Sequence, residues 1–266
     1  MDYSRFAEKY LDIKVNDGVA VVTLNRPERR NAIGADMHLG LEELFHEASF
    51  DVDLRAIVLT GAGEKAFSAG GDVSEFGKDL PGKGTGYLFR GPRYLIQNML
   101  NCEVPIVAAI NGYAIGLGAT LALLSDIIYM ADTATIADTH VNVGLTAGDG
   151  GAVIWPHLVG IHRAKEMLLL GKRVSAADAE RYGLVNYVVP ADKLMDEAMA
   201  CAGELAKGAP FAIRWTKMAL NRQLWQTLNN VLEFGLATEA MTMATQDHKE
   251  AVSAFAEKRA PKFTGK

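Results

Sequence analysis

The sequence predicts an α/β fold in which a strand-and-helix core is followed by an all-helical C-terminal section. Two observations predict this fold. Short apolar, β-rich runs alternate with helical patterns through the first part of the chain. From about residue 209 the strand signals stop and helix-forming residues dominate. The 266 residues, 49% of them hydrophobic, suffice for a large buried core. We therefore expect a core over residues 1–208 and a helical section over 209–266.

The apolar runs predict the strands, and helical spacing predicts the helices of the core. The expected strands lie near residues 11–15, 19–24, 55–60, 105–110, 127–131 and 185–189. The expected helices lie near residues 34–49, 86–101, 116–124, 150–159, 161–169, 175–182 and 191–206. The first helix has apolar residues at helical spacing, namely Met37, Leu41, Leu44, Phe45 and Ala48. A loop is expected at PGKGTG, residues 81–86.

One uncharged stretch, Val104 to Ser125, is long enough to span a bilayer. It is interrupted by Pro105, by an Asn-Gly turn at 111–112, and by two further glycines at 116 and 118. We interpret it as a buried strand, a turn and a buried helix, with a membrane span as the alternative.

Composition and charge exclude some classes of partner. The net charge of −5 and the lack of a long basic run argue against nucleic-acid binding. The charged N-terminal stretch MDYSRFAEKY predicts no signal peptide. Two cysteines, Cys102 and Cys201, indicate no disulfide framework and fit a reducing compartment. We therefore expect a cytoplasmic protein with neither nucleic acid nor membrane as a partner.

Two glycine-rich turns carry the strongest chemical signal: FSAGGD at 67–72 and NGYAIGLGAT at 111–120. Each follows a β-rich apolar run, and the second opens into a helical pattern. Glycine allows close backbone approach, and free N–H groups at such turns attract negative charge. Two donors that converge on one point form an oxyanion hole. The simpler interpretation is a pair of tight strand-to-helix turns.

The same turns, with their flanks, resemble the crotonase superfamily of enoyl-CoA hydratases and isomerases. The resemblance covers LNRPERRNAIG at 24–34, KAFSAGGDVSEF at 65–76, VPIVAAINGYAIGLGATLALLSDIIYMAD at 104–132 and HKEAVSAFAEKRAPKFTGK at 248–266. It implies a crotonase-like ββα superhelix whose C-terminal helices assemble a homotrimer or hexamer. It also implies an acyl-CoA substrate in fatty acid metabolism and no cofactor beyond the CoA of that substrate. The amides of Gly71 and Leu117 would hold the thioester oxygen as it becomes an enolate.

The sequence departs from the family pattern where the hydratases place two acidic residues. Those positions hold Thr120 and His140. A threonine hydroxyl cannot act as a base at neutral pH, whereas a histidine can. Asp149 precedes a helical apolar run, which suggests an N-cap. A carboxylate beside His140 would also fix its tautomer, so we expect Asp149 to orient His140 and His140 to move the proton.

The segment from His140 to Asp149 resembles the crotonase branch that hydrolyses carbon–carbon bonds of β-diketones, typified by 6-oxocamphor hydrolase. That branch has a glutamate where this chain has Glu239, and a second histidine where this chain has Leu117. Glu239 shares a helical stripe with Leu228, Leu232, Gly235 and Leu236. A carboxylate on an apolar stripe is either paired or functional. We expect Glu239 to position a water molecule.

The remaining candidates concern CoA. Arg29 and Arg30 precede a helix and are candidates for pairing with nucleotide phosphates, with solvated surface charges as the alternative. By the resemblance, the turn residues Ser68, Ala69 and Gly70 and the C-terminal Phe263 and Lys266 also contact the substrate. The histidines and cysteines lack metal-binding spacing, so no metal is expected.

Three functions remain open. The first is an enoyl-CoA hydratase/isomerase in which a His/Asp dyad replaces the usual glutamates. The second is a CoA-independent hydrolase of β-diketones. The third is a non-catalytic oligomeric binding protein on the same scaffold.

Overall fold

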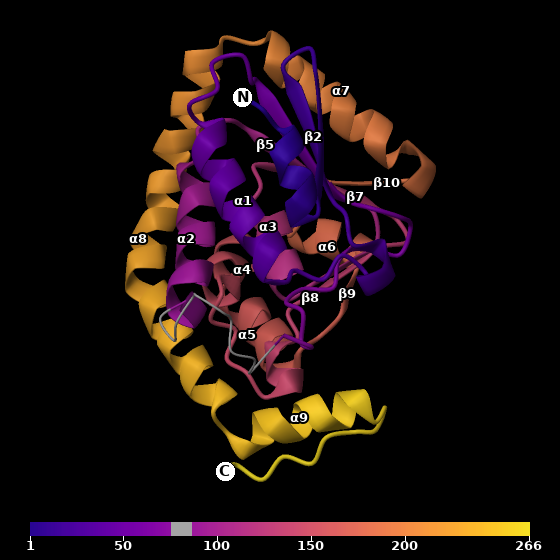
Figure 1. The fold of residues 1–266 in the computed structure, drawn as a ribbon, viewed down its shortest axis with the longest axis vertical. Helices are drawn as coiled ribbons and strands as arrows, with labels where there is room; N and C mark the ends of the chain where they lie inside the picture. Colours follow the sequence, from indigo (N-terminus) through magenta and orange to yellow (C-terminus); the bar gives the residue numbers. More distant parts are fainter. Residues whose placement is uncertain (76–86) are drawn as a thin grey trace.

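The computed structural model of the protein describes residues 1–75 and 87–266 (Figure 1). The loop expected at residues 81–86 lies outside the described residues. The strands are β1 (Leu11–Asn16), β2 (Val19–Leu24), β3 (Ala56–Gly61), β4 (Ala66–Ser68), β5 (Ile106–Ile110), β6 (Tyr113–Ile115), β7 (Ile127–Ala131), β8 (Thr135–Ala137), β9 (Val174–Ser175) and β10 (Tyr187–Val189). The helices are α1 (Ala35–Ala48), α2 (Tyr87–Asn101), α3 (Leu117–Leu123), α4 (Gly151–Val159), α5 (Ile161–Leu170), α6 (Ala176–Tyr182), α7 (Leu194–Lys207), α8 (Pro210–Met243) and α9 (Gln246–Ala256).

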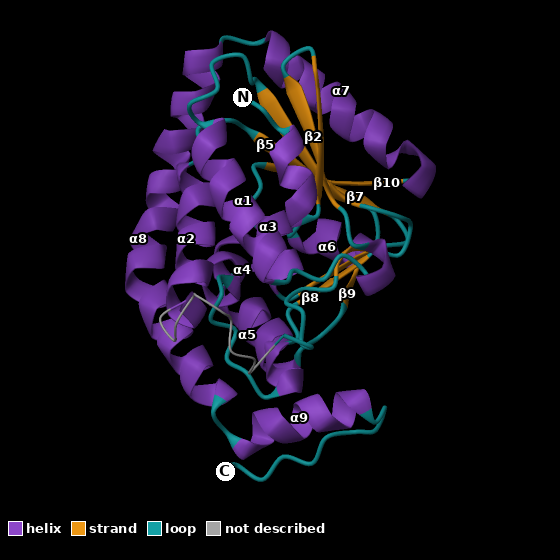
Figure 2. Ribbon diagram, viewed as in Figure 1, coloured by secondary structure: helices purple, strands orange, loops and turns teal. Residues whose placement is uncertain are grey.

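The strands form two sheets (Figure 2). The larger sheet has the order β1-β2-β3-β5-β7-β10, in which β1 and β2 form an antiparallel hairpin and the other pairs are parallel. The smaller sheet has the order β4-β6-β8-β9. Successive pairs such as β3-β4 and β5-β6 give one strand to each sheet before the chain enters a helix. The chain therefore winds as repeated ββα turns, and the predicted fold class is confirmed.

The predicted strands all belong to the larger sheet, and every predicted core helix is present within a few residues of its expected bounds. The strands of the smaller sheet were not predicted. They are two or three residues long, too short to establish an alternating pattern. Residues 104–125 contain β5, β6 and α3. Within residues 1–75 and 87–266, no helix has the length and apolar character needed to cross a membrane.

The core lies around the larger sheet. All residues of β3 and β5 are buried, which is typical of central parallel strands covered on both faces. Helix α7 packs against these strands, and α1 packs against α2. The C-terminal section consists of α8 and α9. Helix α8 runs beside α2 along one side of the molecule, and α9 lies at the far end (Figure 1).

Three buried polar side chains near the start of α8 fasten it to the core. Arg214, Lys217 and Asn221 donate to backbone carbonyl groups. The acceptors are the carbonyl oxygens of Ser49, Asp51, Leu54, Val104 and Leu100. The buried Lys217 also forms an ion pair of 2.7 Å with Asp126, which is partly exposed. These bonds satisfy carbonyl groups at and beyond the ends of α1 and α2, so they set the position of α8.

We expect Lys217→Met to lower the free energy of unfolding by about 1.5–3 kcal/mol, because Asp126 and the Val104 carbonyl lose a charged donor. Urea unfolding measures this change. Lys165→Met is the matched control, since Lys165 is exposed on α5. Equal effects of the two substitutions would contradict the anchoring role of Lys217.

Candidate active site

The candidate site lies where three neighbouring strands of the smaller sheet end. Strands β4, β6 and β8 are parallel, so their carboxyl ends share one edge of the sheet. Gly71 follows β4, Leu117 follows β6, and His140 follows β8, each within three residues of the strand. The short strands missed at the sequence level therefore bring the predicted site residues together.

The first glycine-rich turn leaves the amide of Gly71 without a backbone acceptor. Ile33 forms a parallel bridge to Gly71. In this bridge the Ile33 amide donates to the Gly70 carbonyl at 2.8 Å, and the Asp72 amide donates to the Ile33 carbonyl at 3.1 Å. The backbone groups of Gly70 and Asp72 are thus both hydrogen-bonded to Ile33. The N–H of Gly71 faces the other way and has no hydrogen-bond partner among the described residues.

The second turn presents the first amide of α3. Gly116 precedes this helix with φ 54° and ψ −123°, a conformation that favours glycine. Leu117 is the first helical residue, so its N–H has no acceptor within the helix. The two turns touch: a Cβ at Gly70 would lie 2.6 Å from the Ile115 carbonyl oxygen and 3.5 Å from the Leu117 nitrogen.

Gly71 and Leu117 line one cavity of about 140 Å³ together with His140, Asp149 and Glu239. Most of the wall is apolar. Among the described residues, the rest of the lining consists of Ile33, Gly34, Ala35, His38, Asp72, Glu75, Pro92, Leu236, Ala240 and Met243. The residues that the sequence predicted for the oxyanion hole and for proton transfer therefore line the same cavity.

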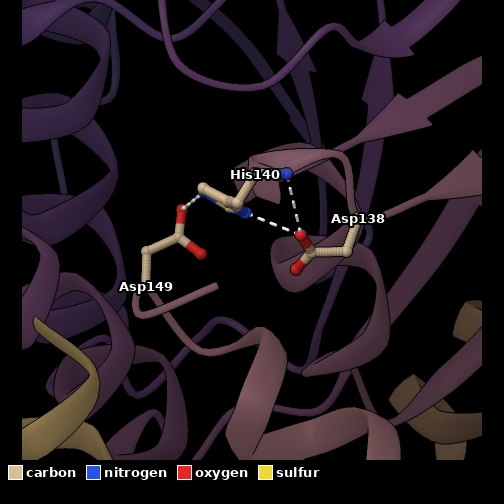
Figure 3. A group of neighbouring side chains, drawn as sticks. All are labelled: Asp138, His140 and Asp149. Carbon is tan, nitrogen blue, oxygen red and sulfur yellow. Dashed lines mark hydrogen bonds and ion pairs between the residues drawn. The ribbon is translucent and has the colours of Figure 1, made fainter. Parts of the chain in front are cut away.

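His140 begins a short 3-10 turn, His140–Val143, directly after β8 and is surrounded by carboxyl groups. Its Nδ1 lies 2.7 Å from Asp138 Oδ1, which also accepts from the His140 amide at 3.2 Å. Its Nε2 lies 3.3 Å from Asp149 Oδ2 and 3.9 Å from Glu239 Oε1. Figure 3 shows Asp138 and Asp149 against opposite nitrogens of the imidazole ring.

One sequence expectation about Asp149 needs correction, and one residue beside His140 was missed. Asp149 does not cap α4, because the N-cap residue is Gly150, with φ 116°, and no side chain bonds to the first turn. The ring nitrogen of His140 farther from Asp149 is held by Asp138, a residue that the sequence reasoning missed. Asp138 could have been found from its position in the sequence, because it lies two residues before His140 at the end of a strand.

Glu239 reaches the site because α8 passes very close to the loop after His140. A Cβ at Gly235 would lie 3.1 Å from the Cα of Gly148, so two glycines permit this approach. Glu239 lies one helical turn further and is buried, as the apolar stripe predicted. Residues of the core and of the C-terminal section thus meet at His140.

The electrostatics of the cluster determine where protons reside. Burial alone would lower the pKa of His140, but the carboxylates of Asp149 and Asp138 outweigh it and raise that pKa well above its ordinary value. Burial, reinforced by Asp149 and partly offset by His140, raises the pKa of Glu239 to about 8. Both shifts favour the protonated forms, the imidazolium of His140 and the neutral acid of Glu239.

Thr120 occupies the other position where the family pattern breaks. It is fully buried, and its hydroxyl has no hydrogen-bond partner in the described part of the chain. A Cβ at Gly150 would lie 2.6 Å from its methyl group. Thr120 therefore packs beneath the loop that carries Asp149.

The residues expected to contact CoA lie outside the lining of this cavity, Gly70 included. Arg29 and Arg30 are exposed just before α1. Ser68 is buried and shapes the turn, since its hydroxyl donates to the Asn31 carbonyl and accepts from the Gly70 amide. Ala69 donates its amide to the Arg30 carbonyl at 2.9 Å.

The two C-terminal candidates, Phe263 and Lys266, lie in the tail that folds back on α9. Both are exposed, and the Lys266 carbonyl accepts from the amides of Gln246 and Asp247.

The cavity also contains polar residues that the sequence did not single out. His38 Nδ1 lies 2.8 Å from Glu42 on α1. Glu75 accepts from the Ala35 amide at the start of α1, and Asp72 pairs with Arg26 at 3.2 Å. No motif marks His38, because α1 has only the pattern of an amphipathic helix. Asp72 and Glu75 lie within KAFSAGGDVSEF at 65–76, but nothing in that segment assigns them a role.

Asp138, His140 and Asp149 also offer metal-ligand atoms within 4.8 Å of one another. An ion would need to sit about 2.0–2.2 Å from each of its donors. The two carboxyl groups contact different ring nitrogens, so the imidazole stands between them. This geometry favours proton exchange over metal binding.

Comparisons with known proteins agree with this architecture. The profile of the family described as Enoyl-CoA hydratase/isomerase matches residues 14–266. A short-chain-enoyl-CoA hydratase of Clostridium acetobutylicum is 35% identical over 91% of this chain and 92% of its own length. A 1,2-epoxyphenylacetyl-CoA isomerase of Escherichia coli is 35% identical over 95% of this chain and 97% of its own. The crystal structure of an enoyl-CoA hydratase/isomerase from Mycobacterium paratuberculosis superposes with a TM-score of 0.86 at 38% identity, covering 92% of this chain and 98% of that one.

We expect Glu239→Gln to make stability less dependent on pH. Between the ordinary value of 4.5 and the raised pKa of about 8, the unfolded chain releases the proton that the folded protein keeps. Stability from this group is therefore lost as pH rises through that window. Glutamine has no proton to lose, so the stability of the variant relative to the unmodified protein should rise from about pH 5 to about pH 8 in urea unfolding. Glu233→Gln, at an exposed position on α8, is the control; a difference that stays constant with pH would contradict the assignment.

Proposed function

Since the chain belongs to the enoyl-CoA hydratase/isomerase family, we propose that it converts an acyl-CoA thioester through an enolate held by the amides of Gly71 and Leu117. The observation that carries the proposal is that both residues line the cavity that also holds His140, Asp149 and Glu239. Two N–H donors directed at the thioester oxygen would stabilise the charge that develops there, which is usually a large part of such catalysis.

The buried cluster supplies the proton transfers. In hydration, the oxygen of water adds to the β-carbon of an enoyl thioester, a base takes a proton from that water, and an acid protonates the α-carbon. Asp149 is the acceptor and the imidazolium of His140 is the donor, since they face each other at 3.3 Å. Glu239, which carries a proton at neutral pH, positions the water. Isomerisation uses the same pair to take a proton from one carbon and return it to another.

The CoA portion is assigned to groups outside the cavity. Arg29 and Arg30 are exposed before α1, where guanidinium groups are available to phosphates. The turn of Ser68, Ala69 and Gly70 provides backbone at the cavity edge. Phe263 and Lys266 would contact the CoA of a neighbouring subunit.

A second candidate is a carbon–carbon hydrolase of β-diketones, and the proximity of Glu239 to His140 favours it. In that reaction a water molecule attacks one carbonyl carbon, the bond to the central carbon breaks, and the departing enolate occupies the same oxyanion hole. The contact between His140 and Asp149 argues against a silent binding protein. Several buried carboxyl oxygens in the cluster lack partners among the described residues, a cost that function explains better than stability does.

The proposed setting is the cytoplasm, in fatty acid metabolism. The two cysteines are free thiols, as expected in a reducing compartment. Relatives named as CoA enzymes support the metabolic role.

We expect enoyl-CoA thioesters to bind in calorimetry and to be hydrated or isomerised, and cyclic β-diketones to be inert. His140→Ala and Asp149→Asn should each lower turnover by roughly 10²–10⁴-fold, because each removes one partner of the proton transfer. His162→Ala, an exposed histidine on α5, is the control and should leave turnover unchanged. Cleavage of diketones without binding of thioesters would contradict the acyl-CoA activity and support the β-diketone hydrolase.

We also propose a homotrimer, single or doubled to a hexamer. Helices α8 and α9 expose large apolar side chains, a feature typical of an interface. They include Phe211, Trp215, Leu220, Phe234, Met241 and Phe255. Light scattering should give three or six times the 28.7 kDa chain mass. Phe234→Glu should weaken assembly, whereas Phe50→Glu, exposed outside these helices, should not. A monomer at micromolar concentration would refute the assembly.

A further inference from the structure

Asp138 is the carboxyl group around His140 for which neither the sequence nor the proposed reaction has a role. It is the first residue after β8, and its side chain is 1% exposed. One oxygen, Oδ1, contacts both the backbone amide and the ring Nδ1 of His140, at 3.2 and 2.7 Å. A single atom therefore holds His140 at two points, which fixes the direction of the ring.

The contact with Oδ1 also decides where the ring carries its permanent proton. An ionised carboxylate oxygen only accepts hydrogen bonds, so Nδ1 must donate. The nitrogen left to gain and lose a proton is Nε2. The groups that face His140 are Asp138 at Nδ1 and, at Nε2, Asp149 and Glu239. The proton exchange is thereby directed to the side of the ring where the other two acids lie.

The surroundings of Asp138 leave room for its carboxyl group but, among the described residues, supply no hydrogen-bond donor to its second oxygen. Its second oxygen, Oδ2, is buried and has no hydrogen-bond partner in the described part of the chain. A Cβ at Gly151, the first residue of α4, would overlap this oxygen. A buried polar atom without a partner costs stability, so a purely structural role does not account for the arrangement.

We propose that Asp138 is a positioning residue that keeps His140 protonated at Nδ1 and so reserves Nε2 for proton exchange with Asp149 and the substrate. The inference rests on the proposed function in taking His140 as the proton carrier. The competing interpretation is that Asp138 merely forms the turn after β8 through the amide of His140.

Histidine-selective ¹⁵N NMR separates the two interpretations without any substrate. The chain has six histidines, and the ring signals of His140 are identified as those missing from the spectrum of His140→Gln. In the unmodified protein the His140 ring should carry hydrogen on Nδ1 throughout, with Nε2 titrating. Asp138→Asn keeps an acceptor for the backbone amide but removes the charge, so the ring should titrate at lower pH and populate the other tautomer. Unchanged ring signals in Asp138→Asn would overturn the proposal.

A second variant covers the case in which Asp138→Asn fails to fold. Gly151→Ala keeps every titratable group but displaces Oδ2, so it should also shift the His140 ring signals. Gly203→Ala is the matched control, because a Cβ at this helical glycine of α7 meets no atom within 4 Å. Equal ring signals in the Gly151 and Gly203 variants would also overturn the proposal.

Kinetics then connect the inference to the reaction. With a turned-over thioester, Asp138→Asn should lower kcat by roughly 10²–10⁴-fold and leave KM nearly unchanged, because the tautomer matters in the chemical step. The pH profile of kcat should shift with the ring titration seen by NMR. Absence of thioester turnover in the unmodified protein would refute the proposed function alone, since the NMR result still tests Asp138. A loss confined to KM would overturn the positioning role.

Discussion

The parallel pairing of β4, β6 and β8 is the constraint on which the site depends. Parallel neighbours end at the same edge of a sheet, so the residue that follows each strand is delivered to one place. Gly71, Leu117 and His140 occupy these positions although they are far apart in sequence. The same rule places Asp138 beside His140, since both follow β8. The larger sheet provides the buried framework, and these three short strands position the residues of the candidate site.

The second constraint is the charge that accumulates at this edge. Asp138, Asp149 and Glu239 surround one buried imidazole, and a buried carboxylate is costly unless it is paired or protonated. In this cluster the pKa values of His140 and Glu239 are both raised, which favours their protonated forms. The resemblance drawn from the sequence implies two acidic residues at the positions that Thr120 and His140 occupy. In this chain the carboxyl groups that face His140 Nε2 come instead from the loop before α4 and from α8.

The sequence predicted the strands of the larger sheet and the core helices, and it missed the short strands of the smaller sheet. The strands of the larger sheet and the core helices were found because five of those strands have five or six residues, long enough for a detectable period, and the three-residue β10 lies within the largely apolar stretch VNYVV at 185–189. Strands such as β8, with three residues, leave no such period, and Asp138 was overlooked with it. The cap assigned to Asp149 was wrong because Gly150, at φ 116°, turns the backbone between that side chain and the helix. Glu239 was found because a carboxylate on an apolar stripe is visible without any tertiary information.

The position of Glu239 depends on contacts at some distance from it. An α-helix rises about 1.5 Å per residue, so the 18 steps from Asn221 to Glu239 form a rod of about 27 Å. Polar anchors fix the rod at one end, where Arg214, Lys217 and Asn221 bond to core carbonyl groups. Close contact between Gly235 and the loop at residue 148 fixes it near the other. A rod held at two points cannot rotate or slide without breaking one set of contacts. The helical section therefore presents the Glu239 carboxyl group to His140 in one register, and the proposed assembly surface and the candidate site share a single element.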